Sequence, residues 1–285
     1  MHVHFLDPYR PRPSLIHRLE ARVKFTAALA CILTAALLPA GAWPAYILLF
    51  TLILAVVILS ELGVGYMLRR AALALPFVLA ALPLLFTVDG PALLRFQVFG
   101  RELALSAPGL ERFLSLALKS WLSLQAALVL TASTPFPELL GAMRAVRIPR
   151  LLVAIFGLMW RYLFVLADEA LRLMRARAAR SGTPARSGTP ARSEAPARSG
   201  TPAGANTKTG GSLAWRARVT GGMAGSLFLR AFDRSDRIYT AMLSRGYDGE
   251  VRSLPLPGLD RGNRLALALC LSLLGLILLT GLLFA

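Results

Sequence analysis

Five long apolar runs constrain this chain of 285 residues more than any other feature. A helix needs about 20 mostly apolar residues to cross the hydrocarbon core of a bilayer, and each run approaches that length. Hydrophobic residues make up 56% of the chain and charged residues 16%, whereas soluble domains carry about 25% charged residues. We therefore expect an all-α membrane protein and not a soluble enzyme. The five predicted transmembrane helices are Val23–Pro39, Trp43–Leu62, Ala71–Val88, Phe113–Thr134 and Leu265–Ala285.

Several of these runs contain residues that interrupt the apolar pattern. Pro76 and Pro83 predict kinks in the third span, because proline removes a helical hydrogen bond. The fourth span carries Lys119 and Gln125, which either face a cavity or pack within the bundle. Cys31 and Cys270 lie inside apolar runs, which indicates small buried side chains and no disulfide scaffold.

A sixth apolar stretch, 151–167, has the length of a span but basic surroundings. Arg161 lies at its centre, where insertion of an arginine costs about 2.5–3.5 kcal/mol. Arginines also flank both ends, so a crossing would place one basic cluster outside the cell. We expect this stretch to lie at the cytoplasmic interface or to pack on other helices. The flanking arginines are Arg144, Arg147 and Arg150 on one side and Arg172, Arg175, Arg177 and Arg180 on the other.

The distribution of charge predicts the topology. The net charge is +17, and residues 135–262 hold 20 of the 32 lysines and arginines. Because basic loops remain cytoplasmic, we expect the N-terminus inside and the C-terminus outside the inner membrane. This gives four predicted regions: a cytoplasmic tail (1–22), four spans (23–134), a cytoplasmic module (135–262) and a last span (263–285).

The cytoplasmic module contains three helical patterns. Thr134 and the prolines after it predict the start of a short helix that reaches Val146, and Ile148-Pro149 ends it. A long helix is predicted from Arg150 to about Arg180, with Asp168 and Glu169 spaced to pair with Arg172. A third helix is predicted from Leu213 to about Ser244.

Two features of this module have a simple physical interpretation. Residues 181–212 form a low-complexity linker, because four copies of Ala-Arg-Ser-Gly/Glu-Thr/Ala-Pro between 179 and 202 put a proline at every sixth position. Within the third helix, Gly221 and Gly225 form a strip on which another helix backbone can pack closely.

The sequence carries no recognisable catalytic, cofactor-binding or metal-binding motif. One alternative function is an intramembrane enzyme acting on a lipid or prenyl diphosphate, in which Asp233 and Asp236 hold Mg²⁺. Arginines alternate with these aspartates, so a solvated, charge-paired helix face is the preferred interpretation. A nucleic-acid partner, suggested by the net charge alone, is disfavoured because aromatic residues do not alternate with the basic ones.

Three segments resemble the transmembrane (T) component of energy-coupling factor (ECF) transporters, in particular its cobalt/nickel CbiQ-type branch. The first is His17-Arg-Leu-Glu-Ala-Arg-Val-Lys24, before the first span. The second is Thr134-Pro-Phe-Pro-Glu-Leu-Leu140, and the third runs from Ser235 to Glu250. The resemblance covers nearly the whole chain outside 181–212.

This resemblance implies a non-catalytic subunit that couples two cytoplasmic ATPases to a substrate-binding membrane subunit for cobalt or nickel uptake. It also implies that two coupling helices each end in an Ala-Arg-Gly-like triplet whose arginine docks on one ATPase. The second triplet is Ser244-Arg245-Gly246. The first matches Ala179-Arg180-Ser181, with Arg177 as a competitor one turn earlier.

Overall fold

The structure, a computed structural model, describes residues 9–88, 91–98, 101–180, 213–248 and 258–284. Contacts divide the chain into two compact units. The first combines His4–Val153 with Arg252–Ala285, and the second is built around Ala154–Val251. Each unit is described by itself below.

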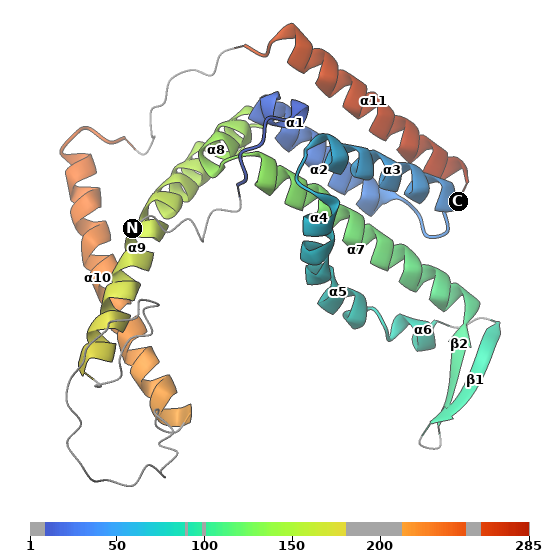
Figure 1. Cartoon of the computed structure of the whole chain (residues 1–285), viewed down its shortest axis with the longest axis horizontal. Helices are drawn as coiled ribbons and strands as arrows, with labels where there is room; N and C mark the ends of the chain where they lie inside the picture. Colours follow the sequence, from blue (N-terminus) through green and yellow to red (C-terminus); the bar gives the residue numbers. More distant parts are fainter. Residues whose placement is uncertain (1–8, 89–90, 99–100, 181–212, 249–257, 285) are drawn as a thin grey trace, which may run out of the picture. The chain divides into compact units, whose positions relative to one another are not determined.

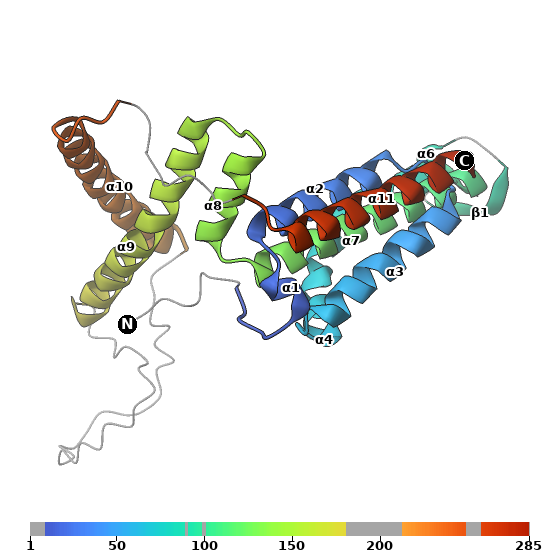
Figure 2. The same ribbon diagram turned by 90° about the horizontal axis from the view of Figure 1, so that it is seen from above.

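The first unit is a helical bundle. Helix α2 packs against α7, α8 and α11, and α3 packs against α7 and α11 (Figures 1 and 2). The last helix of the chain therefore lies beside the first long one. The bounds of these helices are Leu15–Arg18 (α1), Ala21–Leu37 (α2), Trp43–Leu59 (α3), Ala107–Ser133 (α7), Phe136–Ala145 (α8) and Arg261–Leu283 (α11).

The core of this bundle is mainly apolar. Leu49 and Leu122 are fully buried, and Leu38 is 1% exposed. The hydroxyl of Tyr46 reaches the carbonyl oxygen of Pro39 at 2.9 Å, which satisfies a polar group that has no access to water. In contrast, leucines on the outer face of α11 are exposed, as expected for a helix that faces lipid. Lys119 packs against α2, because its Nζ donates to the carbonyl oxygen of Ala36 at 3.3 Å.

Gly281 lets α11 approach α2 and α3 closely. A Cβ atom at this position would collide with the Cδ2 atom of Leu38 and would lie 3.2 Å from the Cβ atom of Ala45. We expect Gly281→Val to lower the free energy of unfolding by about 1–3 kcal/mol, because extra methyl groups overfill a packed contact. Thermal unfolding of the purified protein measures this change. Gly275→Val is the matched control on the same helix, because a Cβ there meets nothing within 4 Å. Equal stability of the two variants would contradict the close packing.

The predicted third span, Ala71–Val88, is not one continuous helix. It is divided into the end of α4 (Val64–Ala71), a 3₁₀ turn η2 (Ala72–Ala74), α5 (Leu75–Ala80) and α6 (Leu84–Thr87). The breaks agree with the expected effect of the two prolines: α5 starts one residue before Pro76, and Pro83 immediately precedes α6.

The segment between the predicted third and fourth spans contains a β-hairpin, so the chain is not purely helical. Strand β1 (Ala92–Val98) pairs antiparallel with β2 (Arg101–Ser106), with a register irregularity between Ala92 and Leu94. Apolar and polar residues alternate in Leu94-Arg-Phe-Gln-Val98, and this period of two is the strand signal. The prediction of an all-α chain includes no strand here, because the segment lies between two long apolar runs.

Three helices of the described residues are long and apolar enough to cross a membrane: α7, α9 (Arg150–Arg180) and α11, with α3 shorter. Of the five predicted spans, the fourth (α7) and the fifth (α11) are thus long and apolar enough to cross a bilayer, whereas α2 has only 17 residues. Helix α9 is also long and apolar enough, although we expect it at the membrane interface because of its arginines. Length and composition therefore support a multi-pass membrane protein without fixing five spans.

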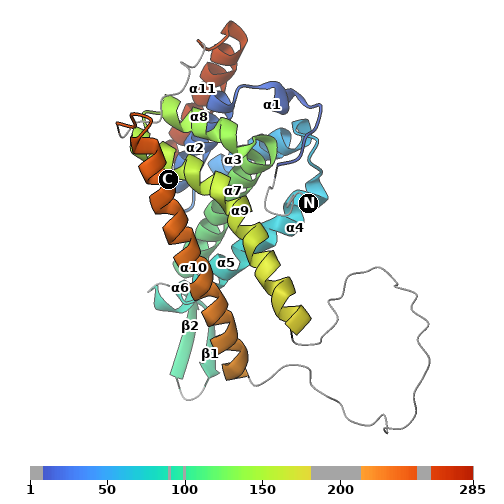
Figure 3. The same ribbon diagram turned by 90° about the vertical axis from the view of Figure 1, so that its left-hand side faces the viewer.

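The second unit pairs α9 with α10 (Leu213–Leu243). Both helices have the bounds that the sequence predicts within one residue. Glu169 pairs with Arg230 and Arg234, whereas Arg177, later on α9, lies over Trp215, earlier on α10. The two helices are therefore antiparallel, and Figure 3 shows them side by side.

Candidate coupling site

Helix α10 ends in a Schellman motif built on Gly246. This glycine has φ +78°, a left-handed conformation that costs other residues free energy. Its N–H donates to the carbonyl oxygen of Leu243 at 2.9 Å, and the N–H of Tyr247 donates to Met242 at 3.0 Å. The structure confirms the predicted stop. Met242 and Tyr247 also line one hollow against α9, which places the turn on the α9–α10 pair.

Arg245 is the residue immediately before this turn, and its side chain is exposed. Its backbone is fixed, because its N–H donates to the carbonyl oxygen of Met242 at 3.1 Å. Ser244 is likewise exposed, and its hydroxyl donates to the carbonyl oxygen of Ala241 at 3.0 Å. The triplet Ser244-Arg245-Gly246 thus presents an exposed guanidinium on an ordered helix end, where a partner protein can reach it.

We expect Gly246→Ala to loosen this helix end. A Cβ at Gly246 meets nothing within 4 Å, so the cost comes from the left-handed backbone alone, about 1 kcal/mol. Amide hydrogen exchange should become faster at Tyr247, whose N–H closes the motif. Gly222→Ala is the control: it lies inside the same helix with equal free space, and alanine favours a helix there. Unchanged exchange in Gly246→Ala would contradict the motif.

The first predicted triplet is only partly described. Ala179 is exposed near the end of α9, and Arg180 is the last residue of that helix. Ser181 lies outside the described residues. The competitor, Arg177, is half-buried and lies 5.5 Å over the ring of Trp215. Because Arg177 already contacts α10, its side chain is less available to a partner protein.

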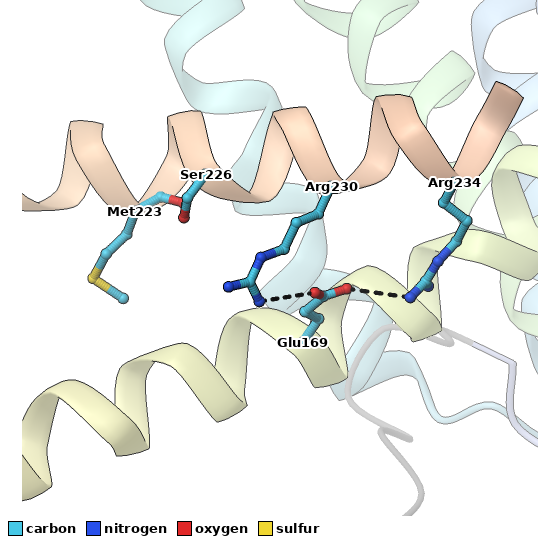
Figure 4. A network of polar contacts seen from close by, with 5 residues as sticks. All are labelled: Glu169, Met223, Ser226, Arg230 and Arg234. Carbon is cyan, nitrogen blue, oxygen red and sulfur yellow. Dashed lines mark hydrogen bonds and ion pairs between the residues drawn. The ribbon is translucent and has the colours of Figure 1, made fainter. Parts of the chain in front are cut away.

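Glu169 joins α9 to α10. Arg230 Nη1 donates to Glu169 Oε1 at 3.3 Å, and Arg234 Nη2 lies 3.5 Å from Glu169 Oε2, so each oxygen has one arginine (Figure 4). The sequence interpretation paired Glu169 with Arg172 on its own helix, and the observed partners correct it. The two arginines lie one turn apart, which places both guanidiniums over one carboxylate.

We expect Glu169→Gln to weaken the α9–α10 pair by about 1 kcal/mol. The effect is modest because the arginines are 57% and 37% exposed, and exposed ion pairs contribute little. A double-mutant cycle with Arg234→Gln, measured by thermal unfolding, isolates the pair. Asp168→Asn is the adjacent control, because no ion pair of Asp168 is present among the described residues. A coupling energy of zero would show that Glu169 does not hold the helices together.

The opposite face of α10 is exposed and largely apolar. Phe228 and Phe232 are 69% and 56% exposed, and Leu243 continues the row. Tyr239, 56% exposed, lies at the edge of this face, because it also lines the hollow against α9. The helical spacing of Phe228, Phe232 and Leu243 keeps them on one side of α10. Gly221 and Gly225 extend this side, and no described atom lies within 4 Å of a Cβ built on either. A helix that packs on this strip is therefore not found among the described residues.

Asp233 and Asp236 are both exposed on α10. Within the described ranges, no group of three metal-ligating side chains is present at this or any other place. The neighbouring arginines pair with Glu169 instead of these aspartates. The geometry therefore gives the intramembrane-enzyme alternative no support.

The junction between α7 and α8 joins two of the segments singled out in the sequence. Lys24 is 7% exposed, and its Nζ donates to the carbonyl oxygen of Ser133 at 3.0 Å. Pro135, and not Thr134, is the N-cap of α8, and the buried Thr134 Oγ1 has no described partner. The predicted start of the helix is correct, but the cap is one residue later.

Comparison with known proteins decides the family. A family model described as "CbiQ: Cobalt transport protein" matches residues 12–198 and 205–255. The chain belongs to the CbiQ cobalt transport family. CbiQ proteins are membrane components of cobalt transport, so the chain is a multi-pass transport component and not an enzyme. The sequence resemblance is thus confirmed.

Individual CbiQ relatives are similar over different parts of the chain. The cobalt transport protein CbiQ of Rhodobacter capsulatus is 28% identical over 204 residues, 72% of each chain. CbiQ of Salmonella typhimurium is 42% identical over 64 residues, 22% of this chain and 28% of its own. A putative fused cobalt transport protein CbiMQ of Methanocorpusculum labreanum is 26% identical over 180 residues, 60% of this chain and 24% of its own. Several curated relatives are thus matched over half their length or less.

Proposed function

We propose that this chain is the coupling subunit of an ECF-type uptake transporter for cobalt, or for nickel. In this role it transmits the motion of two cytoplasmic ATPases to a substrate-binding membrane subunit. The observation that carries the proposal is the exposed Arg245 on the closed end of α10. An exposed guanidinium on an ordered helix end suits docking in a groove lined with carboxylates or carbonyl groups.

The α9–α10 pair suits the transmission of motion. Glu169 with its two arginines links one helix to the other, so a displacement of one helix can be passed to its partner. Arg180, at the end of α9, is the proposed second docking arginine, with Ala179 and Ser181 beside it. The apolar face of α10, with Phe228 and Phe232, is a suitable contact for a membrane partner. A fused CbiMQ relative supports the idea that a CbiQ protein works beside another cobalt transport component.

The proposed topology follows the charges. Residues 135–262 form the cytoplasmic module, 181–212 link its two long helices, and 23–134 and 263–285 cross the membrane in five spans. The N-terminal tail, 1–22, lies inside and the C-terminus outside. Under this topology α9 stays at the cytoplasmic interface, because a crossing would carry basic residues outward.

Two experiments test the proposal. The tagged chain, co-expressed with candidate ATPase and substrate-binding membrane subunits, should co-purify with an ATPase pair and support ATP-dependent ⁵⁷Co uptake in proteoliposomes. Single cysteines test the topology: Glu102→Cys should react with an impermeant maleimide from outside, and Ile148→Cys should not. Uptake without ATP, or without this chain, would exclude the coupling role. Outside labelling at position 148 would exclude the proposed topology.

A further inference from the structure

The N-terminal segment is held firmly beside the end of α7. The N–H of Arg10 donates to the carbonyl oxygen of Ala132 at 3.0 Å, and its own carbonyl oxygen lies 2.9 Å from His17 Nε2. His17 in turn contacts Ser14, which is buried. Arg10 is therefore anchored on both sides of its Cα atom, although its side chain is exposed.

Two guanidinium groups converge on one aromatic ring. The Cζ atom of Arg10 lies 3.8 Å from the ring centre of Tyr66, and that of Arg70 lies 5.0 Å from it. Both carbons are thus within about 10 Å of each other, a separation comparable to the Debye length at physiological salt, so their charges repel. No carboxylate of the described residues lies within ion-pair distance of either arginine. The pair has positive charge that an anion would neutralise.

The arginine pair Arg10 and Arg70 lies near one end of the apolar helix α7. Ala132 belongs to the last turn of α7, which is long and apolar enough to cross a bilayer. A membrane crossing by α7 would place Arg10 where this helix leaves the hydrocarbon core, which is the level of lipid headgroups. Tyr66 and Arg70 lie on one face of α4, whereas Val64 and Leu68 are exposed apolar side chains on the other face of this helix. Tyrosine is itself enriched at this depth.

We propose that Arg10, Tyr66 and Arg70 form a binding site for the headgroup of an anionic phospholipid. The two guanidiniums donate hydrogen bonds to the phosphate oxygens, and the ring of Tyr66 holds them in place. The acyl chains would extend from this headgroup into the hydrocarbon core. The proposal depends on the topology above only for the leaflet, which is the anionic cytoplasmic one when the N-terminus is inside.

Native mass spectrometry of the purified full chain with added lipids tests this site. We expect phosphatidylglycerol to be retained in preference to phosphatidylcholine. Arg10→Gln with Arg70→Gln should weaken phosphatidylglycerol retention about tenfold or more. The matched control is Arg12→Gln with Arg69→Gln, which removes the same charge next to each site residue in sequence and should change retention less than about threefold. Both control arginines are exposed.

Three outcomes would overturn the site. Equal losses in the two double variants would mean that diffuse charge attracts the lipid. Equal retention of phosphatidylcholine would mean that the headgroup charge is not recognised, and full displacement by millimolar inorganic phosphate would mean a site for free anions. If the double variant is unstable, Arg70→Gln and Arg69→Gln provide the same comparison singly. Cobalt uptake is not part of this measurement, so its result is independent of the proposed coupling role.

Discussion

Arg245→Glu is expected to abolish ATP-driven cobalt uptake and to remove the ATPases from the purified complex. A buried interfacial arginine commonly contributes more than about 2 kcal/mol, which corresponds to roughly thirtyfold in affinity. Charge reversal adds repulsion from the acidic groups that would accept the guanidinium. We therefore expect uptake in proteoliposomes to fall at least about tenfold.

The same substitution should leave the fold of the chain intact. Arg245 is exposed, and its only described hydrogen bond comes from the backbone N–H, so the expected change in stability is within about 0.5 kcal/mol. Arg237→Glu is the matched control, because Arg237 is also exposed on α10 but lies two turns before the helix end. Equal loss of uptake in both variants would indicate a general charge effect and not a docking residue.

We expect a smaller loss of cobalt uptake from a substitution at the end of α9. If Arg180 docks on the second ATPase, Arg180→Glu should lower uptake without releasing both ATPases. Arg177 contacts Trp215, so its replacement should act first on the α9–α10 pair and thus on thermal stability. The two arginines are therefore separable by comparing unfolding with uptake.

The sequence predicted the local features of this chain well, because they depend on residues close in sequence. Helix α8 ends at Ala145, within one residue of the predicted end, and Ile148-Pro149 follows shortly after because proline cannot continue a helix. Gly246 marks the end of α10 because a left-handed turn favours glycine. The positions of these two ends required no knowledge of the tertiary structure.

Features that depend on distant contacts were not predictable in this way. Glu169 satisfies the spacing rule for Arg172, but α10 brings two arginines to it, and a rule within one helix cannot foresee a neighbouring helix. The buried contact between Lys24 and Ser133 joins residues 109 positions apart. The hairpin at 92–106 had a readable period of two, which the apolar runs on both sides obscured.

Lys24→Glu is expected to destabilise the chain more than any other single change in the bundle. Lys24 is buried, its ammonium donates to the carbonyl oxygen of Ser133 at the C-terminal end of α7, and Glu138 belongs to the first turn of α8. A cation is favoured at a helix C-terminus by about 1–2 kcal/mol in a partly buried position. A carboxylate at this position would lose that stabilisation, could not donate a hydrogen bond to the carbonyl oxygen of Ser133, and would repel Glu138. We expect these effects together to lower the free energy of unfolding by about 3–5 kcal/mol.

Thermal unfolding in detergent, followed by tryptophan fluorescence, measures this loss. Lys24→Arg keeps the charge and the donor and should retain most of the stability. Arg18→Glu makes the same charge reversal at an exposed position six residues earlier, where the expected change is within about 0.5 kcal/mol. If Lys24→Glu unfolds at the same temperature as Arg18→Glu, the ammonium does not hold α2 to the α7–α8 junction. If Lys24→Glu unfolds at a much lower temperature, the contact between segments 17–24 and 134–140 stabilises the bundle and holds the start of α8 against it.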